Sequence, residues 1–241
     1  MIIKKKRGIA LICARAGSQR LKNKNIKKIN GIPLVGWSIL LAKRLKMIEK
    51  VIVSTNSKRI ISISKKYGAE APFVRPDYLS NSKSNEFFVW RHALLNIKKK
   101  YNFFPDYIIS LPPTCPTRSL PDVKKALNFF LNNKFDTVIS VCNSYRSPYF
   151  NLGKLSKNKS LTLFNSSKFY SRSQDVPMTY DLTTAFFISK SEFILKSDNI
   201  FLGKVGGYVV KKKNGIDIDD YLDFMLSKNI LEKKNEEFNK F

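Results

Sequence analysis

A stretch close to the start of the chain joins an apolar run to a polar, cationic loop. Residues 9–14 are apolar or small, as in a buried strand, and residues 15–25 are rich in small polar residues, arginine and lysine. Backbone N–H groups exposed by Gly17 and Ser18 can point at phosphate oxygens. Arg15 and Lys24 can add charge-assisted hydrogen bonds. The stretch therefore predicts a phosphate-binding loop and, with it, a nucleotide enzyme.

An acidic pair near the other end of the chain is a candidate metal site. Asp217 and Asp219 are separated by one residue in an extended stretch, so their side chains are expected to point the same way. Two neighbouring carboxylates repel unless a cation lies between them, and Mg²⁺ favours such oxygen ligands and bridges phosphates. The alternative is a helix cap, in which Asp219 or Asp220 begins the last helix. The spacing leaves both interpretations open.

Apolar runs that alternate with helical patterns predict the elements that position these residues. Buried strands are expected at residues 8–14, 50–54, 107–111 and 137–142. Helices are expected at residues 34–48, 58–67, 86–98, 121–131 and 221–233. This alternation indicates an α/β fold with a mostly parallel sheet flanked by helices. Ligands bind at the carboxyl ends of such strands, so the candidate loops are 15–25, 75–84 and 112–118.

Other parts of the chain show weaker patterns. Further strands are expected at residues 71–74, 161–164, 184–189 and 207–210. In the last helix, the residues expected to face the core are Leu222, Met225, Leu226 and Ile230. Residues 143–181 otherwise lack periodicity, which is typical of a functional or interface segment. The sequence contains neither an internal repeat nor a linker, so one domain over residues 1–241 is expected.

The composition is strongly basic, with 44 Lys+Arg against 18 Asp+Glu and a formal net charge of +26. Such a charge is compatible with nucleic-acid binding, but the lysines are scattered and no zinc-finger or RNA-recognition signature occurs. We interpret the charge as a solvated surface that attracts small anions, and expect neither nucleic acid nor a membrane as partner. The P-loop and G-x-G-x-x-G motifs are both missing, which disfavours P-loop kinases and dinucleotide oxidoreductases.

The three cysteines indicate neither a disulfide framework nor a structural zinc site. Cys13, Cys115 and Cys142 are odd in number and form no C-x-x-C motif. Cys115 lies in a proline-rich loop and is expected to be more exposed than the other two. The sequence lacks an apolar run of about 18 residues and a signal-peptide cleavage pattern, so a cytoplasmic location is expected.

Several stretches jointly resemble the acylneuraminate cytidylyltransferases (CMP-sialic acid synthetases). In family order they are residues 14–26, 53–55, 67–70, 74–76, 113–118, 172–175 and 216–219. The resemblance implies a Rossmann-like nucleotidyltransferase fold with a dimerisation extension at about 143–181, and hence a homodimer. It also implies that the anomeric hydroxyl of a 2-keto-3-deoxy sugar acid attacks the α-phosphorus of CTP and that pyrophosphate leaves.

The resemblance also implies roles for individual residues. Those expected to hold CTP are Arg15, Ser18, Lys24 and Asn25, with Arg75 near the cytidine. Arg15 and Lys24 would act catalytically by stabilising phosphate charge. Asp217 and Asp219 would bind Mg²⁺. Arg172 and Gln174 would lie toward the sugar or the dimer contact.

The acceptor half of the sequence departs from the family pattern. Pro112 stands where the family usually has Gln, Thr183-Thr184 stands where it has Asn-Gly, and residues 81–83 lack a common Asp. These positions face the sugar in the family, so the acceptor is expected to be another nonulosonic acid of the legionaminic or pseudaminic type. The alternatives are another sugar nucleotidyltransferase, acting on 3-deoxy-manno-octulosonate or a sugar 1-phosphate, and, more distantly, a non-catalytic basic nucleic-acid-binding protein.

Overall fold

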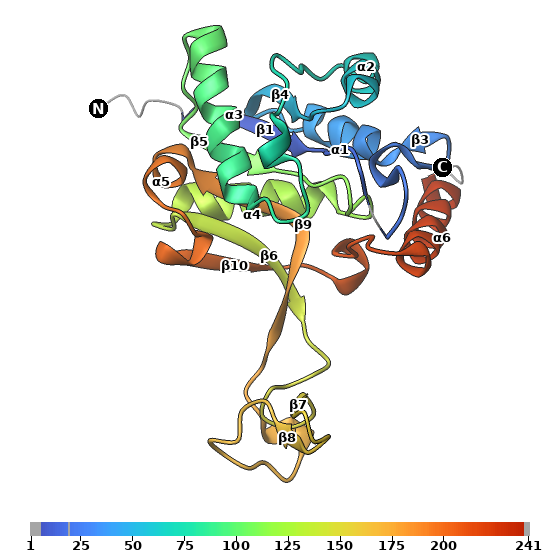
Figure 1. The fold of residues 1–241 in the computed structure, drawn as a ribbon, viewed down its shortest axis with the longest axis vertical. Coiled ribbons are helices and arrows are strands. Elements are labelled where there is room, and N and C mark those ends of the chain that lie inside the picture. The colour runs from blue at the N-terminus through green and yellow to red at the C-terminus, as the bar shows by residue number, and fades with distance from the viewer. Residues whose placement is uncertain (1–5, 19, 239–241) are drawn as a thin grey trace.

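The computed structural model describes residues 6–18 and 20–238, and a twisted central sheet forms its core (Figure 1). Within these residues the sheet has six strands, in the order β10 (Val205–Val209), β6 (Thr137–Asn143), β9 (Tyr180–Lys190), β5 (Tyr107–Ser110), β1 (Gly8–Cys13) and β4 (Ile48–Ser54). β1 pairs in parallel with β4 and β5, and β10 pairs in parallel with β6. β9 is antiparallel to both of its neighbours. The expected mostly parallel sheet is confirmed.

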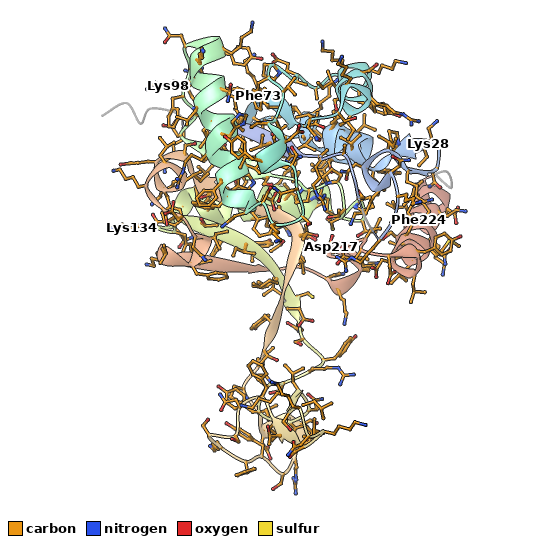
Figure 2. The ribbon with its side chains drawn as sticks, viewed as in Figure 1. Lys28, Phe73, Lys98, Lys134, Asp217 and Phe224 are labelled. Carbon is orange, nitrogen blue, oxygen red and sulfur yellow. The ribbon has the colours of Figure 1, made fainter. Side chains whose placement is uncertain are left out.

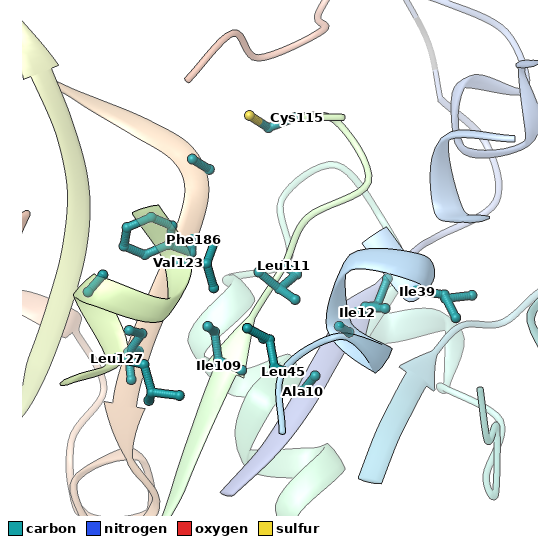
Figure 3. Close-up of a cluster of buried hydrophobic side chains, with 14 of the residues drawn as sticks. Ala10, Ile12, Ile39, Leu45, Ile109, Leu111, Cys115, Val123, Leu127 and Phe186 are labelled. Atoms are coloured by element: carbon teal, nitrogen blue, oxygen red, sulfur yellow. The ribbon is translucent and has the colours of Figure 1, made fainter. Parts of the chain in front are cut away.

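Helices cover both faces of this sheet because its central strands are apolar on both sides. In β1, Ile9 and Leu11 pack on one side and Ala10 and Ile12 on the other. One layer contains α1 (Leu34–Lys43), α2 (Lys58–Lys66) and α4 (Leu120–Asn132), and the other contains α3 (Glu86–Tyr101) and α5 (Ser191–Lys196). Figure 3 shows side chains from β1, β5, β9, α1 and α4 meeting in the first of these layers.

Polar side chains fix where the helices begin. Ser57, Asn85 and Ser119 occupy the N-cap positions of α2, α3 and α4, and each side chain accepts a hydrogen bond from a backbone N–H of the first turn. The caps place the loops that precede these helices at the carboxyl end of the sheet, where a ligand is expected to bind. The polar residues 55–57 thus form the turn that caps α2.

A long arm leaves the body where β6 and β9 run beyond the other strands (Figure 1). Its outer part contains the hairpin β7 (Gly153–Leu155) and β8 (Leu161–Leu163), together with a short 3-10 helix at Ser173–Asp175. Large apolar side chains on the arm are exposed, namely Tyr145, Leu155, Leu161, Phe164, Phe169 and Met178. The arm coincides with the segment that lacks periodicity in the sequence.

The last helix packs against the phosphate-loop region rather than against the main sheet. α6 (Tyr221–Phe238) buries Phe224 and Leu231 beside Leu21 and Ile29, close to the small hairpin of β2 (Lys28–Ile29) and β3 (Ile32–Pro33). The predicted inward face is wrong for Leu222 and Leu226, which are exposed, whereas Met225 packs against the cluster as predicted. The helix has apolar residues on more than one face, and the face with Phe224 and Leu231 is the one that this small cluster buries.

Two further expectations are wrong. Residues 71–74 form no strand, since the only pairing there among the described residues is an isolated bridge between Ile52 and Glu70. Cys115 is fully buried, because its loop folds over the sheet edge and its Sγ contacts the carbonyl oxygen of Asn214. All three cysteines are free thiols. In the described part of the chain, we find no helix with the length and apolar character needed to cross a membrane.

Candidate active site

A cavity of about 390 Å³ opens at the carboxyl ends of β1 and β5. Six of the predicted site residues line it, namely Arg15, Ser18, Lys24, Asn25, Arg75 and Asp219. The charged side chains of the lining are four cations and two carboxylates, namely Arg15, Arg20, Lys24 and Arg75 against Asp219 and Glu86. A cavity with this excess of positive charge suits an anionic ligand.

The loop after β1 is held open by its own hydrogen bonds. The backbone N–H of Ala14 continues the sheet by donating to the Ser54 carbonyl at 3.0 Å. The loop then turns at Gly17, whose φ of +75° favours glycine. Asn25 is buried and donates from Nδ2 to the carbonyl oxygen of Arg15 at 2.9 Å, closing the loop across its base. Asn25 therefore shapes the phosphate loop as well as lining the cavity.

Lys24 ties this loop to the segment before α6. Its Nζ donates to the carbonyl oxygen of Ile218 at 2.6 Å and lies 3.4 Å from Oδ1 of Asp219. Arg20 also contacts that oxygen, from Nη2 at 2.9 Å. The Lys24 side chain is only 15% exposed, so it is held in place at the wall of the cavity. Two cations thus meet one carboxylate at the edge of the phosphate loop.

The two acidic candidates differ in their surroundings. Asp219 lines the cavity, whereas the Oδ1 atom of Asp217 is buried and has no hydrogen-bond partner in the described part of the chain. Asp220 caps α6 by accepting from the backbone N–H of Asp223 at 3.0 Å, while the Asp223 carboxylate accepts from the N–H groups of Asp219 and Asp220. Capping is therefore performed by the Asp220 carboxylate, whereas the Asp219 carboxylate contacts Arg20 and Lys24 instead.

The chemistry of this donor pair fits a hard divalent cation. An unpartnered buried carboxylate oxygen is costly, and a cation at Asp217 would supply the missing partner. Asp219 is the second oxygen donor and now faces Arg20 and Lys24. Within the described residues, no group of three or more Asp, Glu, His or Cys side chains forms a cluster suited to a metal. A metal held here would therefore take its remaining ligands from substrate and water, as Mg²⁺ commonly does.

A buried arginine supports the opposite wall of the cavity. Arg118 donates from Nη1 to Ser38 Oγ at 2.7 Å and from Nη2 to the carbonyl oxygen of Pro112. Pro112 and Thr184 line the cavity, and Thr184 Oγ1 is buried without a partner among the described residues. Thr183 instead turns its hydroxyl to Ser140, at 2.8 Å from Oγ. Of the two threonines, only Thr184 presents an unpaired hydroxyl group at the wall.

Arg172 and Gln174 are not in this cavity. Both belong to the arm, where Arg172 precedes the Ser173–Asp175 turn and Gln174 lines a separate hollow near residues 144–151. Both residues are exposed. Within one chain the nucleotide candidates and Asp219 therefore line one cavity, whereas Asp217, Arg172 and Gln174 are not among its lining residues.

Glu86 is the functional candidate that the sequence analysis missed. It is the first residue of α3 and lines the cavity, and burial raises the pKa of its carboxyl group despite the opposing charge of Arg75. The negative charge of Asp217 also raises the pKa of Glu86. Figure 2 labels Asp217 in the segment that leads to α6. The only sequence signal for Glu86 is an acidic residue directly after a polar loop in a chain with few acids.

Comparisons with known proteins show the family to which the chain belongs. A family model described as Cytidylyltransferase matches residues 9–228. The chain is 35% identical to post-translational flagellin modification protein B of Campylobacter coli over 232 residues, covering 94% of this chain and 96% of that protein. It is 34% identical to CMP-N,N'-diacetyllegionaminic acid synthase of Campylobacter jejuni over 227 residues, again covering 94% of this chain and 96% of the relative.

A solved structure shares the fold. The structure of CMP:2-keto-3-deoxy-manno-octonic acid synthetase complexed with CTP superposes with a TM-score of 0.69 at 13% sequence identity, covering 95% of this chain and all of that one. At this identity the match concerns the fold, and it confirms the predicted nucleotidyltransferase architecture. With the family model and the two relatives covering nearly the whole sequence, the chain belongs to the cytidylyltransferase family.

Proposed function

We propose that this chain transfers CMP from CTP to a nonulosonic 2-keto-3-deoxy sugar acid. The anomeric hydroxyl oxygen attacks the α-phosphorus and forms the new P–O bond. The bond from the α-phosphorus to the bridging oxygen then breaks, pyrophosphate leaves with that electron pair, and the hydroxyl proton passes to solvent. The products are a CMP-sugar and pyrophosphate.

The observation that carries this proposal is the cationic loop at the cavity. Arg15, Ser18, Lys24 and Asn25 lie together on one wall, and Lys24 is held there by Ile218. Phosphoryl transfer asks little covalent work of a protein and depends on positioning and on neutralising phosphate charge. In this assignment Arg15 and Lys24 stabilise the charge that moves onto the leaving pyrophosphate, while Ser18 and Asn25 hold and shape the loop.

Mg²⁺ is the proposed cofactor, held by Asp217 and Asp219. When bound, it would neutralise charge on the phosphates of the nucleotide. The support is the unpartnered buried oxygen of Asp217 and the position of Asp219 on the cavity wall. Lys24 and Arg20 now face Asp219, and both can turn to phosphate oxygens when the nucleotide enters.

The proposed acceptor is a sugar acid of the legionaminic or pseudaminic type. This choice of acceptor is supported by the relative named CMP-N,N'-diacetyllegionaminic acid synthase. Pro112 and Thr184, at which the sequence departs from the family pattern, both line the cavity, and this supports an acceptor other than N-acetylneuraminic acid. A reaction that consumes CTP also suits the cytoplasmic location proposed for the chain.

A homodimer is proposed through the arm. Its exposed apolar side chains include Phe164 and Phe169, and exposed apolar patches of this kind mark contact surfaces. A second copy is the occupant proposed because the arm projects from the body and carries Arg172 and Gln174 away from its own cavity (Figure 1). In a dimer these two residues would act at the contact or toward a bound sugar.

The test is pyrophosphate release from CTP with a panel of acceptors. The panel contains legionaminic, pseudaminic, N-acetylneuraminic and 3-deoxy-manno-octulosonic acids, with a sugar 1-phosphate as the alternative acceptor. Mg²⁺-dependent turnover with a nonulosonic acid is expected. Turnover with the sugar 1-phosphate alone, or only with 3-deoxy-manno-octulosonate, would replace the proposed acceptor. A protein that neither binds CTP nor turns over any member would refute the proposal.

A further inference from the structure

The cavity lining that residues 75–89 contribute has a different character from the phosphate loop. Arg75 and Glu86 belong to it, together with the apolar side chains of Leu79 and Val89. One strong donor group and one acceptor group therefore stand next to a small apolar surface. This combination suits a flat heterocycle with polar edges more than a phosphate.

Arg75 supplies donors that nothing in the described chain uses. The residue is 4% exposed, and its Nε and Nη2 atoms have no hydrogen-bond partner among the described residues. Its backbone N–H donates to the Thr55 carbonyl at 2.9 Å, which fixes the residue at the sheet edge. Burial lowers the pKa of the guanidinium, but an arginine remains charged in proteins. A ligand at this part of the lining must therefore bring hydrogen-bond acceptors to Arg75.

Glu86 supplies a fixed acceptor. Its Oε1 atom accepts from Trp90 Nε1 and from Ser110 Oγ, each at 3.3 Å. The second oxygen, Oε2, makes no hydrogen bond with any described residue, and the carboxylate lines the cavity. The pairing on Oε1 thus sets the direction in which Oε2 is offered to a ligand.

Arg75 and Glu86 do not neutralise each other directly. The ion pairs between described residues do not include one between these two, although each lies within electrostatic range of the other. A buried cation and a buried anion that stay apart leave both with unused hydrogen-bonding capacity. A ligand edge carrying a donor at one end and acceptors at the other would use both.

The Watson–Crick edge of cytosine has this order of groups. Its exocyclic N4 amino group donates, and N3 and O2 accept; a carboxylate accepting from cytosine N4 is a common recognition pair. Uracil would place O4 against the carboxylate and N3–H against the guanidinium, two unfavourable contacts. Leaving buried polar groups unpaired in this way is how a site rejects a near-isosteric ligand.

We propose that Glu86 is the residue that sets the choice of cytosine over uracil, by accepting from the N4 amino group through Oε2 while Arg75 donates to the ring acceptors. The inference rests on the proposed use of CTP and names the residue that selects the nucleotide. It assigns Glu86 to substrate recognition rather than to proton transfer.

The test is the affinity of CTP and UTP for the full-length protein, measured by calorimetry with Mg²⁺ and without acceptor. In Glu86→Gln the amide oxygen is expected to stay with Trp90 Nε1, a group that can only donate, which turns the amide N–H toward the base. That N–H opposes N4 of cytosine and suits O4 of uracil. The preference for CTP over UTP should therefore fall by about tenfold or more.

Glu192→Gln is the matched control, because it removes the same charge from an exposed position outside this cavity. It should leave the CTP preference unchanged. A Glu86→Gln protein that loses affinity for both nucleotides equally, or loses turnover while keeping its CTP preference, would overturn the inference.

Should the variant fail to fold, the affinity of the wild-type protein for 2-pyrimidinone riboside triphosphate, which lacks the amino group, is compared with its affinity for CTP. Weaker binding than CTP by about tenfold supports the inference, and equal binding overturns it.

Failure of this inference is distinguishable from failure of the proposed function. A wild-type protein that binds neither CTP nor UTP contradicts both. Selective CTP binding that survives Glu86→Gln contradicts only the role of Glu86. Selective CTP binding that is lost in the variant, without turnover of any sugar acid, supports Glu86 and contradicts the proposed acceptor.

Discussion

The ammonium group of Lys24 lies 3.4 Å from Oδ1 of Asp219, although the two residues are 195 positions apart in the chain. The same Nζ donates to the carbonyl oxygen of Ile218 at 2.6 Å. One side chain thus joins the phosphate loop to the segment that carries both acidic candidates. A triphosphate entering the cavity would compete with Asp219 for Lys24, which would free the carboxylate for a metal.

Replacing Lys24 with alanine should reduce turnover with CTP by about 100-fold or more, because a charge that stabilises the departing pyrophosphate is lost. Pyrophosphate release at saturating acceptor measures this effect. Lys28→Ala is the matched control, since Lys28 is an exposed lysine of the nearby β2 strand and does not line the cavity. Equal activity of the Lys24→Ala and Lys28→Ala proteins would show that Lys24 has no catalytic role.

The acidic segment allows a sharp comparison between neighbours. Asp219→Asn should raise the Mg²⁺ concentration needed for half-maximal activity by about tenfold or more, because a charged oxygen ligand becomes neutral. Asp220→Asn should leave it unchanged, because asparagine caps a helix about as well as aspartate and Asp220 is the residue that caps α6. Binding of Mn²⁺ in the presence of CTP, followed by electron paramagnetic resonance, gives a readout independent of turnover. The same Mn²⁺ affinity in both variants contradicts the metal assignment.

Sequence reasoning succeeded where a local pattern determines the outcome. The apolar run at Ile9–Ile12 is buried on both faces of the sheet, as expected for a buried strand. The strand-end rule brought Arg15, Lys24 and Arg75 into one cavity. Each of these outcomes depends on a few neighbouring residues and on one general rule of parallel sheets.

Sequence reasoning was insufficient where distant contacts decide. The direction of β9 depends on how the arm returns to the body, which the apolar run at residues 184–189 does not encode. Helix α6 has apolar residues on more than one face, and contact with Leu21 and Ile29 selects Phe224 and Leu231 rather than Leu222. Glu86 was missed because its value lies in lining the same cavity as Arg75, a relationship between residues that no spacing in the chain reveals.

The arm should control assembly. In a double variant Phe164→Ser and Phe169→Ser, the loss of two exposed apolar side chains should dissociate the proposed dimer. Sedimentation velocity on the full-length protein measures this change. Phe201→Ser is the matched control, because Phe201 is an exposed phenylalanine on the body, in the 3-10 helix Ile200–Leu202. A wild-type protein that sediments as a monomer at tens-of-micromolar concentration, or a double variant that stays dimeric, would rule out this contact.

Asp136 should make a pH-dependent contribution to stability. Its carboxylate accepts from Lys190 Nζ and from the backbone N–H of Lys204, each at 2.9 Å, and these bonds lower its pKa below the usual 3.8. Because its pKa is lower in the folded state, the Asp136 carboxylate stabilises the fold at pH values above its unfolded-state pKa. This stabilisation disappears as the pH falls from the unfolded-state pKa through the folded-state pKa. Because the pair is partly exposed, Asp136→Asn should cost about 0.5–1 kcal/mol of unfolding free energy at pH 7.

Urea unfolding of the wild-type and Asp136→Asn proteins between pH 7 and pH 3 checks this expectation. The difference in unfolding free energy should stay constant down to about pH 5 and shrink below the usual aspartate pKa, because the wild-type carboxylate then becomes protonated in both states. Asp198→Asn serves as the control, since the Asp198 carboxylate is 72% exposed and its pair with Arg91 should contribute less. A difference that grows toward pH 3 would mean that the Asp136 carboxylate destabilises the fold, and that β9 and β10 are held at this corner by backbone pairing alone.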